Sequence, residues 1–204
     1  MITGPKYKRA RRLGAHVYDK TMGQKFALSL ARRGKPKDPK HPRQKTDYGN
    51  QMLEKQKVRF TYGISERQFV KYVRESMAQK AVKPTEEIFR RLESRLDNAV
   101  YRLGLANSRQ FSRQLVSHRH IQVNGKNVTI PSYELSKGDV ITIRPGSLKK
   151  PLFATLDEKL KTVTAPAWLG FDVKKKEAVI AGAPKMEKEL LQFNLASVIE
   201  FYSR

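Results

Sequence analysis

The tetrapeptide Ser117-His118-Arg119-His120 combines a hydroxyl, two imidazoles and a guanidinium within four residues. A serine acts as a nucleophile beside a base that a carboxylate orients, and a zinc ion normally takes four protein ligands. The sequence places no carboxylate next to the tetrapeptide, contains no cysteine, and has its two other histidines far away, at positions 16 and 41. We therefore expect neither a metal ion nor nucleophilic catalysis here.

Phosphate binding is the chemistry that suits these residues better. Ser108 and Arg109 are predicted to begin a helix, and the backbone amides at a helix start attract anions. We expect this helix start to lie next to the basic turn 117–120, so that both form one surface. The candidate RNA-binding residues of this surface are Ser108, Arg109, Arg113, Gln114, Ser117, His118, Arg119 and His120.

The charge of the whole chain also favours phosphate binding over the alternative that these basic residues merely face solvent. Lys and Arg number 42 against 19 Asp and Glu, which gives a net charge of +23. Such an excess indicates a partner with dense negative charge, and no apolar run approaches the roughly 20 residues of a membrane span. We therefore expect nucleic acid as the partner, no membrane and, without cysteines or a secretory signal at the start, a cytoplasmic location.

The basic residues are concentrated in the first third of the chain. Residues 1–60 hold 17 basic and 4 acidic side chains, and prolines and like charges between Gly34 and Arg43 disfavour helix and sheet. We expect residues 1–46 to form an extended arm that RNA orders. Aromatic rings between the basic residues could stack on unpaired bases, and the RNA-binding candidates are Lys6, Tyr7, Lys8, Arg9, Arg11, Arg12, Tyr48, Lys55, Lys57 and Arg59.

Hydrophobic periodicity predicts the elements that position these residues. Ser65 can cap a helix with buried Phe69 and Val73, whose exposed face adds Arg67 and Lys71 to the RNA-binding candidates. One long helix is predicted from Thr85 to Leu103, a shorter one after Ser108, and a last one over 194–202. A weaker pattern favours a helix near 156–161.

The period then changes to that of strands. Ile121–Val123 and 126–130 flank the pair Asn124-Gly125, which is typical of a tight hairpin, and a third strand is predicted over 140–143. No glycine-rich nucleotide-binding loop is present, so we expect no energy-consuming activity.

One string resembles a known family, the ribosomal protein four family of the bacterial small subunit. The string is Leu92-Glu93-Ser94-Arg95-Leu96-Asp97-Asn98-Ala99-Val100-Tyr101-Arg102-Leu103-Gly104. The similarity continues through 108–109, 113–125 and 127–133, and it includes Asp47-Tyr48-Gly49, Trp168-Leu169 and Tyr202-Ser203. It therefore covers nearly the whole chain.

The resemblance implies an α+β fold with three parts. These are the basic extended arm, a mainly helical domain of residues 47–92 completed by 165–204, and an inserted small RNA-binding domain of two helices and a β-sheet over 93–155. It also implies a non-enzymatic constituent of the small ribosomal subunit that binds a junction in the 5′ domain of 16S rRNA early in assembly. Ribosomal protein five as a neighbour, a role in decoding accuracy, mRNA near the entry channel and repression of its own operon are further implications.

The chain departs from many members of that family in one respect. Those members hold zinc with a cysteine cluster in the arm, whereas this chain has no cysteine and so resembles the zinc-free branch. We expect no metal and no cofactor. RNA, Tyr7 with its neighbours, and the packing of Phe26 and Leu28 are expected to order the arm instead.

Two other functions are compatible with parts of the sequence. Arg95-Leu96-Asp97 resembles the triplet that carries the catalytic aspartate of pseudouridine synthases, which share the small domain. Because the triplet lies in a predicted amphipathic helix, we expect Asp97 to be structural, paired with Arg102 or a backbone amide. A stand-alone RNA chaperone or ribosome-rescue factor is the second alternative, and the helical region 48–83 argues against it.

Overall fold

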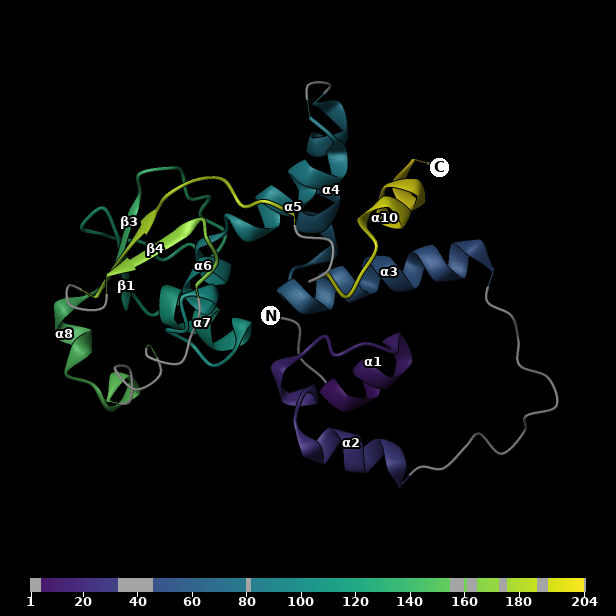
Figure 1. Ribbon diagram of the computed structural model, residues 1–204, viewed down its shortest axis with the longest axis horizontal. Helices are drawn as coiled ribbons and strands as arrows, with labels where there is room; N and C mark the ends of the chain where they lie inside the picture. The colour runs from purple at the N-terminus through teal and green to yellow at the C-terminus, as the bar shows by residue number, and fades with distance from the viewer. Residues whose placement is uncertain are drawn as a thin grey trace. The chain divides into compact units, whose positions relative to one another are not determined.

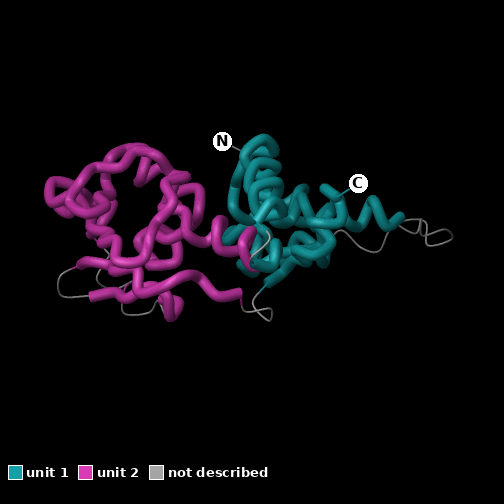
Figure 2. The backbone as a smooth tube through the Cα atoms, turned by 90° about the horizontal axis from the view of Figure 1, so that it is seen from above, with its two compact units in different colours: residues 1–85, 187–204 teal, residues 86–186 magenta. Residues whose placement is uncertain are grey.

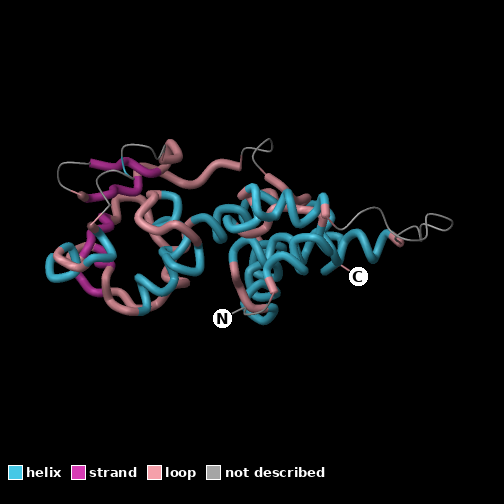
Figure 3. Tube along the Cα trace, turned by 90° about the horizontal axis from the view of Figure 1, so that it is seen from below, coloured by secondary structure: helices cyan, strands magenta, loops and turns pink. Residues whose placement is uncertain are grey.

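The computed structural model describes residues 5–32, 46–79, 82–154, 160, 165–172, 176–186 and 191–203. The chain divides into two compact units, residues 1–85 with 187–204 and residues 86–186 (Figure 2). Within the described residues, the first unit is helical and every strand belongs to the second (Figure 3). The fold is therefore α+β, as expected from the sequence. No described helix is long and apolar enough to cross a membrane.

The first unit contains five described α-helices, shown in Figure 1. They are α1 (Lys6–Leu13), α2 (Gln24–Ala31), α3 (Asp47–Tyr62), α4 (Glu66–Ala78) and α10 (Leu195–Tyr202), with the 3₁₀ turn η1 (Asp19–Thr21) between α1 and α2. Side chains cap three of them, because Thr46, Ser65 and Asn194 accept hydrogen bonds from backbone amides in the first turns of α3, α4 and α10. The helix predicted after Ser65 and the last helix are thus confirmed, and α10 packs against α3.

The expectation of an extended arm is wrong for residues 6–13 and 24–31, which are helical. Ala10 and Leu13 of α1 form a small core with Val17 and Phe26, and partly buried residues of α3 pack against it. Apolar residues among so many cations gave a weak periodic signal, and tertiary packing stabilises these short helices. The proline-rich stretch 34–43 lies outside the described residues.

The second unit combines helices with an antiparallel sheet of strand order β2-β1-β3-β5-β4. Its helices are α5 (Pro84–Glu93), which begins at the end of the first unit, α6 (Leu96–Arg102), α7 (Arg109–Ser117), α8 (Pro145–Leu148) and the 3₁₀ turn η2 (Pro151–Phe153). Its strands are β1 (Ile121–Val123), β2 (Lys126–Asn127), β3 (Val140–Ile143), β4 (Leu169–Asp172) and β5 (Glu177–Ile180). Buried residues of α6, α7 and one sheet face form its core.

The sheet differs from the predicted one in extent. The hairpin at Asn124-Gly125 is confirmed, with backbone φ angles of 51° and 75° at its two turn residues, but β2 ends at Asn127 instead of 130. We expected the whole segment 165–204 to complete the helical domain, whereas β4 and β5 join the sheet beside β3. These four-residue strands carry too few alternating apolar residues to stand out in the sequence. The helix expected near 156–161 lies outside the described residues, apart from buried Leu160.

The long helix predicted from Thr85 to Leu103 is broken into α5 and α6 at Ser94 and Arg95. Arg95 has an extended backbone, with φ −67° and ψ 138°, and forms an isolated β-bridge with Glu134. The Leu96 amide donates to the Tyr133 carbonyl, and the Leu135 amide donates to the Ser94 carbonyl, both at 2.9 Å. Hydrogen bonds to a distant segment thus replace helical ones, which apolar spacing alone could not reveal.

Candidate nucleic-acid interface

Helix α7 separates two groups that the sequence was expected to bring together. Ser108 lies at its start, where Oγ accepts a hydrogen bond from the Phe111 amide. The basic turn 117–120 lies at its other end, about 13 Å away for nine helical residues. The two groups are therefore not direct neighbours, because the length of the helix separates them, and a single phosphate-binding surface that spans both stays a prediction.

Asp97 stands at the centre of a buried ion-pair network. Arg95 donates to both of its carboxylate oxygens, at 3.0 and 2.7 Å, and Arg113 Nη2 donates to Oδ2 at 2.9 Å. Only 2% of the Arg95 side chain and 6% of the Asp97 side chain are exposed. Asp97 therefore has a structural role, but its partners are Arg95 and Arg113 instead of the expected Arg102.

A second network ties α7 to α6. The Glu93 carboxylate accepts hydrogen bonds from Arg102, at 2.9 Å to each oxygen, and from Asn98 at 2.8 Å. Asn98 in turn accepts a hydrogen bond from Arg109 Nε at 2.8 Å, and the Arg109 guanidinium lies over the Tyr101 ring. Arg109 and Arg113, both candidates for RNA contact, thus hold α7 against α6, and substituting either also removes structural support.

A cluster of exposed basic side chains lies beyond the C-terminal end of α7. The pairing of Ile121 with Ile143 and a 2.9 Å hydrogen bond from the Arg144 amide to the His120 carbonyl place the start of β1 beside the end of β3. Exposed side chains from both segments gather there. We call this cluster the basic corner, and it consists of His118, Arg119, Arg144, Lys149 and Lys150.

Only some residues of the basic corner were identified from the sequence. His118 and Arg119 were predicted to contact RNA, whereas Arg144, Lys149 and Lys150 were missed. The available signal was the basic stretch that directly follows the third predicted strand, since antiparallel neighbours bring the end of one strand beside the start of the other. Arg119 has a φ of +61°, an uncommon value for a residue other than glycine, so the turn holds it in a defined conformation.

His120 lies beneath this cluster instead of on it. Its residue is 8% exposed, and its Nδ1 atom lies 2.9 Å from the buried Ser147 hydroxyl. Burial lowers the pKa of His120, and the positive charges of Lys150, His118 and Arg144 lower it further. His120 therefore lies beneath the exposed side chains of the basic corner, and its direct contact with RNA stays a prediction that its burial disfavours.

Three candidates on α3 are engaged within the first unit. Lys55 is 7% exposed, and its ammonium lies 3.0 Å from Glu66 and 4.4 Å from the centre of the Phe201 ring. Arg59 also pairs with Glu66, at 2.7 Å, and Lys57 pairs with Glu54 at 2.6 Å. Lys55 in particular is packed inside the unit, so the structure gives it a stabilising role.

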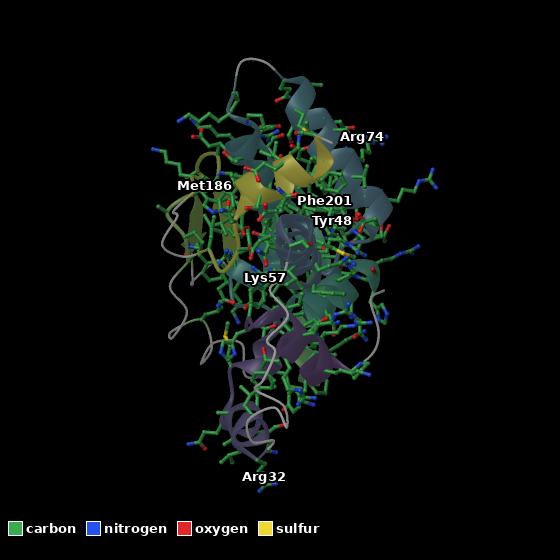
Figure 4. The ribbon with its side chains drawn as sticks, turned by 90° about the vertical axis from the view of Figure 1, so that its right-hand side faces the viewer. Arg32, Tyr48, Lys57, Arg74, Met186 and Phe201 are labelled. Atoms are coloured by element: carbon green, nitrogen blue, oxygen red, sulfur yellow. The ribbon has the colours of Figure 1, made fainter. Side chains whose placement is uncertain are left out.

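The remaining candidates vary in their exposure. Tyr48 lies beside Phe201 with ring centres 5.3 Å apart, yet 51% of it stays exposed (Figure 4). Tyr7 packs against Phe26, and Leu28, expected to pack, is exposed. Lys6 lies near the Tyr18 ring, Arg9 lies over the Phe60 ring, and Arg11 donates to Ser29. The exposed candidates are Lys8, Arg12, Arg67, Lys71, Gln114 and Ser117.

Glu66 makes the stability of the first unit dependent on pH. Burial raises its pKa, but hydrogen bonds from Tyr202 and Lys55 and the charges of Arg59 and Lys55 outweigh burial, so the pKa lies below its ordinary 4.5. The ionised carboxylate therefore stabilises the fold fully above pH 4.5, and this contribution is lost as the pH falls through the lowered value.

We expect Glu66→Gln to weaken the dependence of thermal stability on pH in this acidic range. The measurement is the melting temperature, followed by circular dichroism in steps from neutral pH down to strongly acidic buffer. Glu75→Gln is a matched control, because its contact with Lys71 is a loose 3.7 Å pair on the surface of α4. Parallel melting curves for Glu66→Gln and the wild type would contradict the assignment.

Comparison with known proteins gives matches to both units. A family model described as "Ribosomal protein S4/S9 N-terminal domain" matches residues 1–93, and one described as "S4 domain" matches residues 94–141. The chain is 40% identical to small ribosomal subunit protein uS4 of Laribacter hongkongensis over 204 residues, which cover 99% of this chain and 98% of that protein. Small ribosomal subunit protein uS4 of Herpetosiphon aurantiacus is 41% identical over 210 residues, with 99% and 98% covered. The two models meet at Ser94, where α5 gives way to α6.

Proposed function

Because the chain belongs to the uS4 family of small ribosomal subunit proteins, we propose that it binds a helical junction in the 5′ domain of 16S rRNA early in subunit assembly. Membership makes the chain a structural, rRNA-binding constituent of the small ribosomal subunit, in a family without enzymatic activity. The proposal adds two points to family membership, namely which residues contact the rRNA and which domain of the rRNA they bind.

The basic corner is the observation that carries this proposal. Arg119, Arg144, Lys149 and Lys150 form no ion pair with a carboxylate of the described residues, unlike Lys55, Lys57, Arg59 and Arg113. Arg144 and Lys150 both act on His120 electrostatically, and like charges in one neighbourhood repel one another, so an external anion would stabilise them. Consecutive phosphates of an RNA backbone supply such charge, and releasing their counterions adds affinity.

The first unit offers a surface for a protein neighbour. Tyr48 and Met52, one turn apart on α3, are 51% and 40% exposed, and Tyr48 packs beside Phe201 of α10. Exposed aromatic and methionine side chains are enriched at protein interfaces. We infer that ribosomal protein five packs here, and the family resemblance adds roles in decoding accuracy, at the mRNA entry region and in repression of the chain's own operon.

A binding experiment with two RNA domains tests the proposal. We expect the purified chain to bind a 16S 5′-domain transcript tightly and a 3′-domain transcript of equal length far more weakly. The logarithm of the association constant should fall linearly with that of salt concentration, with a slope of about −3 or steeper if four phosphates are neutralised. Equal affinity for both transcripts, or binding that is insensitive to salt, would overturn the proposal.

Sedimentation separates this function from that of a chaperone or rescue factor. A structural constituent should remain on small subunits at a stoichiometry near one after a high-salt wash. A transient factor would be released into the supernatant under the same conditions.

A further inference from the structure

His120 is a buried titratable side chain held directly beneath the basic corner. Its ring packs edge-to-face against the Phe153 ring, with ring centres 6.1 Å apart, and its centre lies 6.3 Å from that of the His118 ring. The proposed RNA contact uses the exposed cations above it and does not require His120 itself. This placement raises the question of what a buried imidazole does under a phosphate-binding surface.

The contact between His120 and Ser147 tolerates a change of protonation. Nδ1 lies 2.9 Å from the Ser147 hydroxyl, which can donate to an unprotonated nitrogen or accept from a protonated one. Rotation of one hydroxyl hydrogen is therefore enough for either state. The hydrogen bond from the Arg144 amide to the His120 carbonyl involves no ring atom and is unaffected. The ring can gain a proton while the corner keeps its shape.

The surroundings of the ring disfavour that proton while the corner has no anion. Among the described residues, the groups that face it are His118 from its own turn, Arg144 after β3, Ser147 of α8, Lys150, and Phe153 of η2. None of these is a carboxylate, and three can carry positive charge. Burial and this repulsion together lower the pKa of His120.

We propose that an RNA phosphate bound at the basic corner draws a proton onto His120, so that the affinity of the corner for RNA rises as the pH falls below neutral. The phosphate charge offsets the repulsion from Lys150, Arg144 and His118, which makes the imidazolium more stable. Thermodynamic linkage then requires the reverse effect, namely that protonated His120 favours phosphate binding. The inference rests on the proposed RNA-binding function and adds a proton-linked control to the same site.

Proton nuclear magnetic resonance of the histidine rings tests the coupling without RNA. Sulfate serves as the probe, because it does not itself titrate near neutral pH, and His120→Gln and His118→Gln assign the two resonances. We expect sulfate to move the titration midpoint of His120 to higher pH in the full-length chain. An unchanged His120 midpoint at saturating sulfate, or the absence of saturable binding at the corner, overturns the inference.

RNA binding tests the same coupling from the other side. Between pH 8 and pH 6 we expect the wild type to gain about tenfold in affinity for the 5′-domain transcript. His118→Gln, which also removes an imidazole but at an exposed position, should retain most of this gain, whereas His120→Gln should lose it. If His120→Gln does not fold, the titration midpoint of His120 in the wild type is compared with and without the transcript. A midpoint that moves to higher pH with the transcript supports the inference, and an unchanged midpoint contradicts it.

The outcomes distinguish this inference from the proposed function. Salt-dependent binding with the same pH dependence in the wild type and His120→Gln would remove the proton linkage and leave RNA binding in place. Absence of RNA binding at every pH would remove the proposed function, whereas a sulfate-induced shift of His120 alone would identify a site for free anions.

Discussion

Replacing Asp97 by Asn lowers the free energy of unfolding by about 3–5 kcal/mol, because it leaves two arginines without their shared carboxylate. Arg95 is almost completely buried, so water cannot replace the carboxylate that the substitution removes from its guanidinium. Arg113 loses its partner on α6 as well. An amide of the same shape keeps only one acceptor oxygen and carries no charge, so equal packing alone cannot compensate.

Trp168 provides the measurement for this prediction. It is the single tryptophan of the chain and packs against the core of the second unit, so its fluorescence during urea unfolding reports on that unit. Glu134→Gln is the control, since its ion pair with Arg90 is half exposed and should contribute less than about 1 kcal/mol. Similar losses of unfolding free energy for the two variants would show that the buried network stabilises the fold no more than the exposed ion pair does.

The same variant bears on the pseudouridine synthase alternative. Both carboxylate oxygens of Asp97 accept hydrogen bonds from arginines within the unit, which leaves it poorly placed to attack a uridine. A destabilised Asp97→Asn chain that still binds RNA at low temperature agrees with a structural role. Uridine conversion by the wild type that this variant abolishes would contradict it.

Replacing Lys149 and Lys150 together by Ala lowers affinity for the 16S 5′-domain transcript by about 10–100-fold near 0.1 M salt. Both side chains are exposed, and neither pairs with a carboxylate of the described residues, so the change should leave the fold intact. The slope of the logarithm of affinity against that of salt concentration should become shallower by about 2, since two fewer phosphates are neutralised. Filter binding over a salt series measures both quantities.

Lys126 and Lys137 supply a control with the same loss of charge at another place. Lys126 pairs with Val123 at the far end of β1, and Lys137 precedes β3, whereas the basic corner lies where Ile121 pairs with Ile143. Lys126→Ala with Lys137→Ala should therefore have a much smaller effect. Equal losses for the two double variants would mean that total charge, and not the corner, determines affinity.

Local signals in the sequence were enough for several elements of the fold. Ser65, Ser108 and Asn194 cap the helices predicted after them, and Asn124-Gly125 forms the predicted hairpin turn. These features depend on residues within four positions of one another, so a short stretch of sequence includes both partners of each interaction and is enough to predict it. The break between α5 and α6 was missed because it depends on residues 131–135, which are distant in the chain.

The sequence by itself determined that the chain is strongly cationic, that its partner carries negative charge, and to which family it belongs. Only the tertiary structure decided which cations are available to that partner. Arg113 and Lys55 are neutralised by carboxylates distant from them in sequence, whereas strand pairing brings Arg144 beside the turn that carries Arg119, and Lys150 lies near His120 of that turn. The physical reason is that a charge contributes to binding according to what lies within a few ångströms of it in space.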